Sequence, residues 1–223
     1  EAALGALLPP GVAIAVWSPA LGESELGPRE AEAIARAVPK RRTEFARGRA
    51  CAREALRRAG CGVEASVGAP DSSGFVEIPV GASRAPVWPE GFTGSITHCD
   101  GFVAAVAARA GVVRGIGLDA EPDRPLPDGV AAQVLTPEEQ ASPPDSLHDI
   151  VRFSAKESIH KAVFPLTGVW LDFLDVALEL DDGAFRARPA AGARVTTPVL
   201  DGLAGRYTRV AGVVVTVAWV PRL

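Results

Sequence analysis

One order of elements occurs twice along the chain and constrains the fold more than any other feature. A strand-like apolar segment at Leu7–Trp17 is followed by two segments that read as helices, Pro28–Val38 and Arg41–Ala59. In the second of these, apolar residues recur at helical spacing. Pro39 is expected to break the first helix and Gly60 to end the second.

The same order then begins again. Glycines and prolines dominate Gly62–Gly94, which predicts short strands and loops. Ser95–Ala108 is apolar and compatible with a strand, although its alanines leave a helix possible. The second round starts near Gly111–Gly115 with a strand at Val112–Ala120. Thr136 marks a helix start, because proline follows at the first helical position and glutamate at the third.

The next helix is predicted at Asp149–Phe164, closed by Pro165. β-branched and aromatic runs predict further strands at Val176–Leu180, Phe185–Ala187 and Val210–Val220. The expected fold is therefore α+β. It would consist of two similar α/β halves, residues 1–112 and 113–223, packed side by side.

Bulk composition excludes several classes of protein. The net charge of −4 argues against a general nucleic-acid binder. Cys51, Cys61 and Cys99 are odd in number and lack metal-ligand spacing, so neither a disulfide framework nor a zinc site is indicated. No apolar stretch reaches the ~18 residues that a membrane span needs, and no cleavable signal pattern opens the chain. A cytoplasmic protein without a membrane partner is expected.

Basic residues crowd into one short stretch. The members of this stretch are Lys40, Arg41, Arg42, Arg47, Arg49, Arg53, Arg57 and Arg58. A charge run is usually a solvated helix face. A local phosphate-binding patch is the alternative. Arginine outnumbers lysine 20 to 3 in the whole chain, so each lysine is a notable choice.

Two carboxylates follow the apolar strand of the second half. Asp119 and Glu121 are two residues apart, so on a strand they project from the same face, opposite to Leu118 and Ala120. Adjacent carboxylates repel each other unless a cation lies between them. Oxygen ligands of this kind suit Mg²⁺, which often bridges to substrate phosphates. The alternative is an exposed strand end with two solvated acids.

A second group of polar residues lies on the predicted helix after it. Glu157 and Lys161 are four residues apart and therefore neighbours on one helix face. They could form an ordinary surface ion pair, and Ser154 with Glu157 also fits a capping box. Lys156 and Lys161 are two of the three lysines. Lysine, unlike arginine, gives up a proton readily, which indicates a site that needs a transferable proton beside phosphate.

A third group surrounds a lone histidine. His98 follows the hydroxyl residues Ser95 and Thr97. Such a histidine is more often a satisfied core residue than a functional one, and the hydroxyls could equally serve a turn. Arg84 lies upstream in a Gly/Pro-rich loop, where it could reach an anion or merely face water.

Together these motifs resemble the 4′-phosphopantetheinyl transferases of the larger, surfactin-synthetase-activating type, in their actinomycete and enterobactin-type branch. The resemblance spans Pro39 to Asp172 and places five motifs in the family's order. They are Arg49 within EFARGRACAREAL, Arg84 and Trp88 within RAPVWP, then GSITHC, GIGLDAEP and FSAKESIHKAVFPLTG. Phe153 stands where many relatives carry tryptophan, and Gly62–Ser83 does not align with confidence.

The resemblance implies a pseudo-two-fold fold whose active site lies in the cleft between the halves. Residues 1–112 would bind the adenosine end of coenzyme A, and residues 113–223 would carry the metal and the catalytic residues. Mg²⁺ is the implied ion, with Mn²⁺ possible. By position, the metal ligands would be Asp119, Glu121 and Glu157. The residues implied to bind coenzyme A are Arg41, Arg49, Arg84, Thr97 and His98, with Lys161 on the pyrophosphate; arginine suits phosphate as a charged, planar donor.

The implied reaction moves phosphopantetheine from coenzyme A to a serine of an acyl or peptidyl carrier protein of polyketide or non-ribosomal peptide synthesis. Glu157, directly or through a water held by the metal, would take the serine proton, and Lys161 would stabilise or protonate the departing 3′,5′-ADP. A monomer is expected, because both halves are in one chain. Two other classes stay open from the residues alone: a Mg²⁺-dependent phosphohydrolase or nuclease, and a non-catalytic module that docks an acidic carrier protein.

Overall fold

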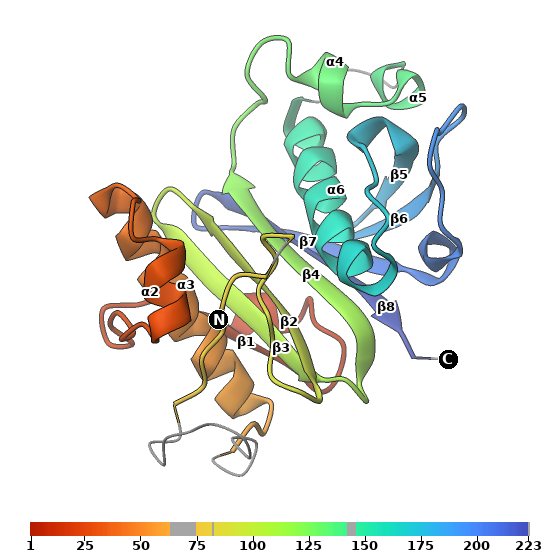
Figure 1. Cartoon of the computed structure of the whole chain (residues 1–223). Helices are drawn as coiled ribbons and strands as arrows, with labels where there is room; N and C mark the ends of the chain where they lie inside the picture. Colours follow the sequence, from red (N-terminus) through yellow and green to blue (C-terminus); the bar gives the residue numbers. More distant parts are fainter. Residues whose placement is uncertain (63–74, 82, 142–145, 223) are drawn as a thin grey trace.

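The computed structural model describes residues 1–62, 75–81, 83–141 and 146–222. They form two β-sheets, each with one long helix packed against it (Figure 1). Among these residues, no helix combines the length and apolar character needed to cross a membrane.

The first half contains a three-stranded antiparallel sheet in the order β1-β3-β2. Its elements are α1 (Ala2–Gly5), β1 (Val12–Val16), α2 (Pro28–Ala33), α3 (Pro39–Arg58), β2 (Phe92–Cys99) and β3 (Phe102–Arg109). Small residues of α3, such as Ala52 and Ala55, pack against Ala105 and Ala107 of β3. This close packing buries one face of the sheet.

The second half contains a five-stranded antiparallel sheet in the order β4-β8-β7-β6-β5. Its strands are β4 (Val113–Pro122), β5 (Val176–Asp181), β6 (Ala184–Pro189), β7 (Ala204–Val210) and β8 (Val213–Pro221). Its helices are α4 (Ala131–Val134), α5 (Pro137–Gln140), α6 (Ser146–Thr167) and the short 3₁₀ turns η2 (Phe173–Asp175) and η3 (Pro198–Gly202). In both sheets the first strand of the half pairs with the last one.

The two sheets meet where β2 lies beside β4 (Figure 1). Side chains join them there: Ser95 Oγ lies 3.5 Å from the carbonyl oxygen of Leu118, and Ala120 N donates to Thr97 Oγ1 at 3.0 Å. One core cluster contains residues of both halves, among them Ile14, Val106, Leu118 and Val217. The halves therefore share a hydrophobic core.

Two glycines of β4 let α6 lie directly on the strand. A Cβ atom on Gly117 would stand 1.8 Å from the carbonyl oxygen of Ser158, and one on Gly115 would stand 2.4 Å from that of Ala162. Both distances are too short for any side chain, so only glycine fits at these positions. This approach brings the polar residues of α6 next to those of β4.

A buried glutamate stabilises the first half. Glu30, at the third position of α2, accepts hydrogen bonds from the backbone N–H groups of Gly27 and Ile78 at 2.9 and 2.8 Å. Arg53 of α3 donates to the same carboxylate at 2.5 Å, and Arg49 Nε lies 3.5 Å from it. Because Glu30 is fully buried, these partners are needed to offset its loss of hydration.

The second half repeats this arrangement. Glu139, at the third position of α5, accepts from the backbone N–H groups of Thr136 and Leu178 at 2.8 and 2.9 Å. Its cationic partner is Lys156 of α6, whose Nζ lies 2.6 Å from it. In each half, a short helix that begins with proline is thus fastened to the long helix by a buried ion pair.

The helix start at Thr136 is confirmed, but two predicted single strands are hairpins. Ser95–Ala108 contains the turn Asp100–Gly101 between β2 and β3, and Val210–Val220 contains the turn Ala211–Gly212 between β7 and β8. Gly101 and Gly212 both have a φ of +77°, a conformation that favours glycine. Apolar residues on both sides of each turn make the two strands look continuous in the sequence.

Four predicted boundaries were wrong, two of them at prolines. Pro39 does not break a helix but begins α3, where its missing N–H costs nothing. Pro165 does not end α6, which continues for two more residues. Within Leu7–Trp17 only five residues pair as β1, and α2 ends at Ala33. In Gly62–Gly94, residues 63–74 and 82 lie outside the described residues.

Candidate active site

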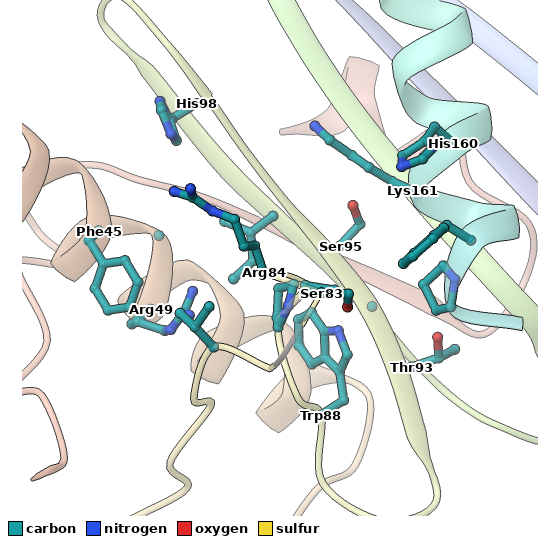
Figure 2. A pocket seen from close by; sticks show the side chains of 18 of the residues that line it. Phe45, Arg49, Ser83, Arg84, Trp88, Thr93, Ser95, His98, His160 and Lys161 are labelled. Carbon is teal, nitrogen blue, oxygen red and sulfur yellow. The ribbon is translucent and has the colours of Figure 1, made fainter. Parts of the chain in front are cut away.

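A cleft of about 610 Å³ is lined by residues of both halves. The first half contributes α3, the loop before β2, and β2 itself, while the second half contributes β4 and α6. Figure 2 shows Arg84, His98 and Lys161 extending toward the same space from three separate elements. Basic residues far apart in sequence therefore meet in one cleft.

His98 and Arg41 form a close pair at one end of the cleft. Arg41 Nη1 lies 2.5 Å from His98 Nε2. Because arginine can only donate, His98 Nε2 accepts and the imidazole is neutral with its proton on Nδ1. Partial burial and the charge of Arg41 lower the pKa of His98, although Glu44 Oε2 lies 3.8 Å from Nδ1. An incoming anion would find a cation and a polar ring here.

Arg84 stands at the tip of a tight loop over the cleft. Its φ is +65°, an uncommon conformation for a residue other than glycine, and it costs about 1 kcal/mol or more. The loop is closed by hydrogen bonds from Gly81 N to the carbonyl oxygen of Ala85 at 2.8 Å and from Arg84 N to that of Gly81 at 2.9 Å. Figure 2 shows the guanidinium group extending into the cleft.

Arg49 also lines the cleft but is almost completely buried, with 4% of its surface exposed. Its guanidinium carbon lies 4.0 Å above the ring of Phe45. Burial lowers the pKa of Arg49 to about 10, which still leaves it charged at neutral pH. Its Nε has no hydrogen-bond partner among the described residues and lies 3.5 Å from Glu30. The guanidinium group of Arg49 therefore also lies next to the buried Glu30–Arg53 pair of the first half.

Asp119 is the most highly bonded acid of the site. Lys161 Nζ donates to its Oδ1 at 2.7 Å and to the carbonyl oxygen of Leu118 at 3.2 Å. Ser154 Oγ donates to its Oδ2 at 2.8 Å, and Thr97 Oγ1 lies 3.5 Å from Oδ1. These partners keep a buried carboxylate, 4% exposed, in one orientation.

Glu121 and Glu157 complete an acidic group around Asp119. Burial and the charges of Asp119 and Glu157 raise the pKa of Glu121 to about 7, against the opposing effect of Lys161. Burial and the charge of Asp119 likewise raise the pKa of Glu157. A divalent cation would relieve the repulsion among these acids.

The acids do not form a complete metal cage. Across the described ranges, no three His, Cys, Asp or Glu side chains stand together in a way that could hold a metal ion. Mg²⁺ does not require such a cage, since it keeps several waters and commonly uses one or two carboxylates together with substrate phosphates. A donor set of hard oxygens on β4 and α6 is therefore suited to Mg²⁺ with a phosphate-bearing substrate.

Comparison with known families assigns both halves. The model of the 4′-phosphopantetheinyl transferase N-terminal domain matches residues 29–108, and that of the 4′-phosphopantetheinyl transferase superfamily matches residues 115–209. The chain is 45% identical to 4′-phosphopantetheinyl transferase Svp of Streptomyces mobaraensis over 207 residues, which cover 86% of this chain and 78% of that protein. The chain belongs to the 4′-phosphopantetheinyl transferase superfamily.

Other relatives agree with this assignment. The chain is 39% identical to 4′-phosphopantetheinyl transferase PptT of Mycobacterium tuberculosis, over 85% of this chain and 83% of that protein. It is 33% identical to enterobactin synthase component D of Salmonella typhi over 55% of this chain and 48% of that protein. The chain is thus a transferase, and the two alternative classes left open by the residues are not favoured.

The structure brings most of the predicted site residues of this transferase together. Asp119, Glu121, Glu157 and Lys161 interact across β4 and α6. Arg41, Arg49, Arg84 and His98 line the cleft with Lys161. Thr97 differs, because its hydroxyl is buried against β4 and accepts from Ala120 N. The roles of these residues toward coenzyme A and metal stay predictions.

Two interpretations of α6 were wrong. Ser154 does not cap the helix, because α6 begins at Ser146 and Ser154 lies in its interior. Lys156 does not share the cleft with Lys161: its Nζ is buried and donates to Glu139 and to the carbonyl oxygens of Val134 and Phe173. Only one of the two neighbouring lysines can therefore serve the reaction.

Aromatic residues of the cleft were missed by sequence reasoning. His160, Phe164 and Trp170 pack together, with ring centroids 4.5 Å apart for His160 and Trp170 and 5.3 Å apart for His160 and Phe164. Trp170 lines the cleft as well and is 66% exposed. Trp88, already part of a recognised motif, lines it from the first half. His160 and Phe164 lie four residues apart within a recognised motif, so helical spacing places them on one face, but the sequence does not indicate that this face borders the cleft.

Proposed function

We propose that this transferase moves the 4′-phosphopantetheine group of coenzyme A to a serine hydroxyl of an acyl or peptidyl carrier protein. The observation that carries the proposal is a cleft lined by several basic residues, one of which, Lys161, is paired with Asp119. Asp119, Glu121 and Glu157 do not themselves line the cleft, but they form an acidic group next to Lys161. The cations suit the phosphates of the adenosine end, and the acids suit a divalent cation that would bind the reacting pyrophosphate.

The serine oxygen forms a bond to the β-phosphorus of coenzyme A, and the bond from that phosphorus to the 3′,5′-ADP oxygen breaks. Glu157, directly or through a water held by the metal, takes the proton of the serine hydroxyl. Lys161 leaves Asp119 to stabilise the charge on the departing 3′,5′-ADP. Arg41, Arg84 and His98 hold the adenosine end, which fixes the orientation of the pyrophosphate.

Mg²⁺, or Mn²⁺ in its place, would be held by Asp119 and Glu121, with Glu157 as a third candidate ligand, and would neutralise charge on the pyrophosphate oxygens. The acidic donor set and the raised pKa values of Glu121 and Glu157 support this assignment. Asp119 already meets one cation in Lys161, which indicates that its carboxylate is placed to receive positive charge.

The two halves, residues 1–112 and 113–223, are proposed to be related by a pseudo-two-fold axis, as in the surfactin-type branch. Two features support the relation: each sheet pairs its first strand with its last, and each half has a buried glutamate that joins a short helix to a long one. Similarity to enterobactin synthase component D supports the enterobactin-type branch. Carrier proteins of non-ribosomal peptide or polyketide synthesis are proposed as the acceptors. A monomeric, cytoplasmic enzyme is proposed with it.

The test is a transfer assay. The protein is mixed with an apo carrier protein, coenzyme A and Mg²⁺, and the acceptor is weighed by mass spectrometry. A gain of one phosphopantetheine group, absent when Mg²⁺ is replaced by EDTA, is the expected result. If no peptidyl or acyl carrier protein gains this mass, the proposal is overturned.

A further inference from the structure

The hydroxyl groups of Ser154 and Thr216 lie on the buried side of Asp119, and no step of the proposed reaction uses them. Ser154 Oγ donates to Asp119 Oδ2 at 2.8 Å, and Thr216 Oγ1 lies 3.0 Å from Ser154 Oγ. Ser154 and Thr216 are completely buried. The three residues come from α6, β8 and β4, so these contacts join three elements at one point.

The direction of these hydrogen bonds follows from their chemistry. A serine inside a helix commonly donates to a carbonyl of the preceding turn. Ser154 donates to Asp119 instead, and an ionised carboxylate can only accept. The proton of Thr216 is directed to Ser154, whose carbonyl oxygen lies 2.9 Å from Thr216 Oγ1. With its own proton on that carbonyl oxygen, Thr216 Oγ1 faces Ser154 Oγ as an acceptor. The single hydroxyl proton of Ser154 goes to Asp119, because an ionised carboxylate is a stronger acceptor than a hydroxyl oxygen.

This arrangement distinguishes the two oxygens of Asp119. Oδ2 is taken by Ser154 on the buried side. Oδ1 contacts Lys161, a residue that lines the cleft, at 2.7 Å. Rotation of the carboxylate group would break both contacts together. Oδ1 is consequently the oxygen that already meets a positive charge on the side of the cleft-lining Lys161.

We infer that Ser154 and Thr216 are positioning residues that fix the Asp119 carboxylate with Oδ1 turned toward a bound divalent cation. The inference rests on the proposed metal role of Asp119. Hydrogen-bond partners of metal-binding carboxylates typically change metal affinity or activity by about 10- to 100-fold when they are removed. Ser154→Ala is expected to weaken metal binding at the lower end of that range, since Lys161 still contacts Asp119.

The chain offers a matched control. Ser158 lies one turn further along α6, is equally buried, and donates to the carbonyl oxygen of Ala155 within its own helix. Ser158→Ala removes the same atom from the same helix without touching Asp119. Thr216→Val removes the second hydroxyl and keeps the shape of the side chain, so it tests the same inference if Ser154→Ala folds poorly.

The experiment measures Mn²⁺ binding by electron paramagnetic resonance, with saturating coenzyme A, for the full chain and for Ser154→Ala, Thr216→Val, Ser158→Ala and Asp119→Asn. Thermal unfolding checks that each variant is folded. The expected result is a Kd for Mn²⁺ raised about 10-fold in Ser154→Ala, raised less in Thr216→Val and unchanged in Ser158→Ala. Transfer activity of Ser154→Ala should recover at high Mg²⁺, which a general packing defect would not allow.

The outcomes separate the two ideas. If Asp119→Asn loses Mn²⁺ binding while folded Ser154→Ala and Thr216→Val both bind as the unmodified protein does, the positioning role is overturned and the metal site stands. If Asp119→Asn binds Mn²⁺ normally, the metal role of Asp119 fails and the inference fails with it. If Ser158→Ala weakens binding as much as Ser154→Ala, the effect belongs to helix packing and the inference is overturned.

Discussion

α3 and α6 carry the same short pattern in different settings. Ala52-Arg53-Glu54 on α3 corresponds to Ala155-Lys156-Glu157 on α6, and in each helix a basic residue follows the glutamate by four positions. The middle cation of each pattern reaches a buried glutamate of its own half. The following basic residue of each helix donates to a carbonyl oxygen of the first strand of its half.

The two glutamates nevertheless have opposite properties. Glu54 is bound by Arg57 and Arg58 at 2.8 and 2.7 Å, and these hydrogen bonds lower its pKa to about 2. The pKa of Glu157 is raised, because burial and the charge of Asp119 both disfavour its ionised form. One glutamate is a neutralised surface group and the other is a candidate base.

The difference comes from the strand beneath each helix. Arg58 donates to the carbonyl oxygen of Ile14, and the next residue on β1 is Ala15; Lys161 donates to that of Leu118, and the next residue on β4 is Asp119. A helix pattern alone therefore does not make a site. On α6 the same pattern becomes part of a candidate site because the carboxylates of β4 lie next to it.

The largest expected effect concerns the shared buried ion pairs. Lys156→Met leaves Glu139 buried without a cation and should lower the free energy of unfolding by about 3–5 kcal/mol. Arg53→Met should cost less, because Arg49 Nε still lies 3.5 Å from Glu30. Urea unfolding measures both. A loss in Arg53→Met equal to or larger than that in Lys156→Met would contradict the comparison.

Catalytic variants test the difference between the two helices. Glu157→Gln and Lys161→Ala should each lower kcat by about 10²- to 10³-fold, since each removes a group that stabilises charge or moves a proton at the reacting phosphorus. The control variants Glu54→Gln and Arg58→Ala should keep kcat. Carrier-protein transfer rates at saturating coenzyme A give the answer, and equal losses in the two helices would refute the assignment.

The smallest expected effect is the acid dependence of Glu54. Its pKa of about 2 in the folded protein lies below the ordinary 4.5, so its ion pairs stabilise the fold above pH 4.5. That contribution is lost as the pH falls from 4.5 toward 2. Glu54→Gln should flatten this part of the pH-stability profile by less than about 1 kcal/mol, because the pairs lie at the surface. An unchanged profile would show that they contribute nothing.

The sequence predicted the motifs well and their partners poorly. The strand with Asp119 and the helix with Glu157 and Lys161 follow from local periodicity. The contact between Lys161 and Asp119 joins residues 42 positions apart and depends on helix and strand touching at Gly117, which no local pattern reveals. Helical geometry does explain Lys156: adjacent helix positions point about 100° apart, so it could not share the face of Glu157.

The hairpins teach a related point. Asp100–Gly101 is a strong turn signal, but the apolar residues on both sides conceal it. The basic residues of the cleft were easier to predict, since Arg84 and His98 lie in recognised motifs and Arg41 lies in the crowded basic stretch. The buried partner of Arg49 could not be predicted, because Glu30 lies on a separate short helix and its burial depends on tertiary packing.

The core shared by β1, β3, β4 and β8 has a consequence for how the molecule loses its structure. Separating the halves would expose the apolar residues of this core on both sides, so melting should be a single cooperative transition. A ligand that binds only the folded cleft would then raise the melting temperature of the entire chain. Calorimetry with and without coenzyme A would read occupancy of the cleft directly, without a carrier protein.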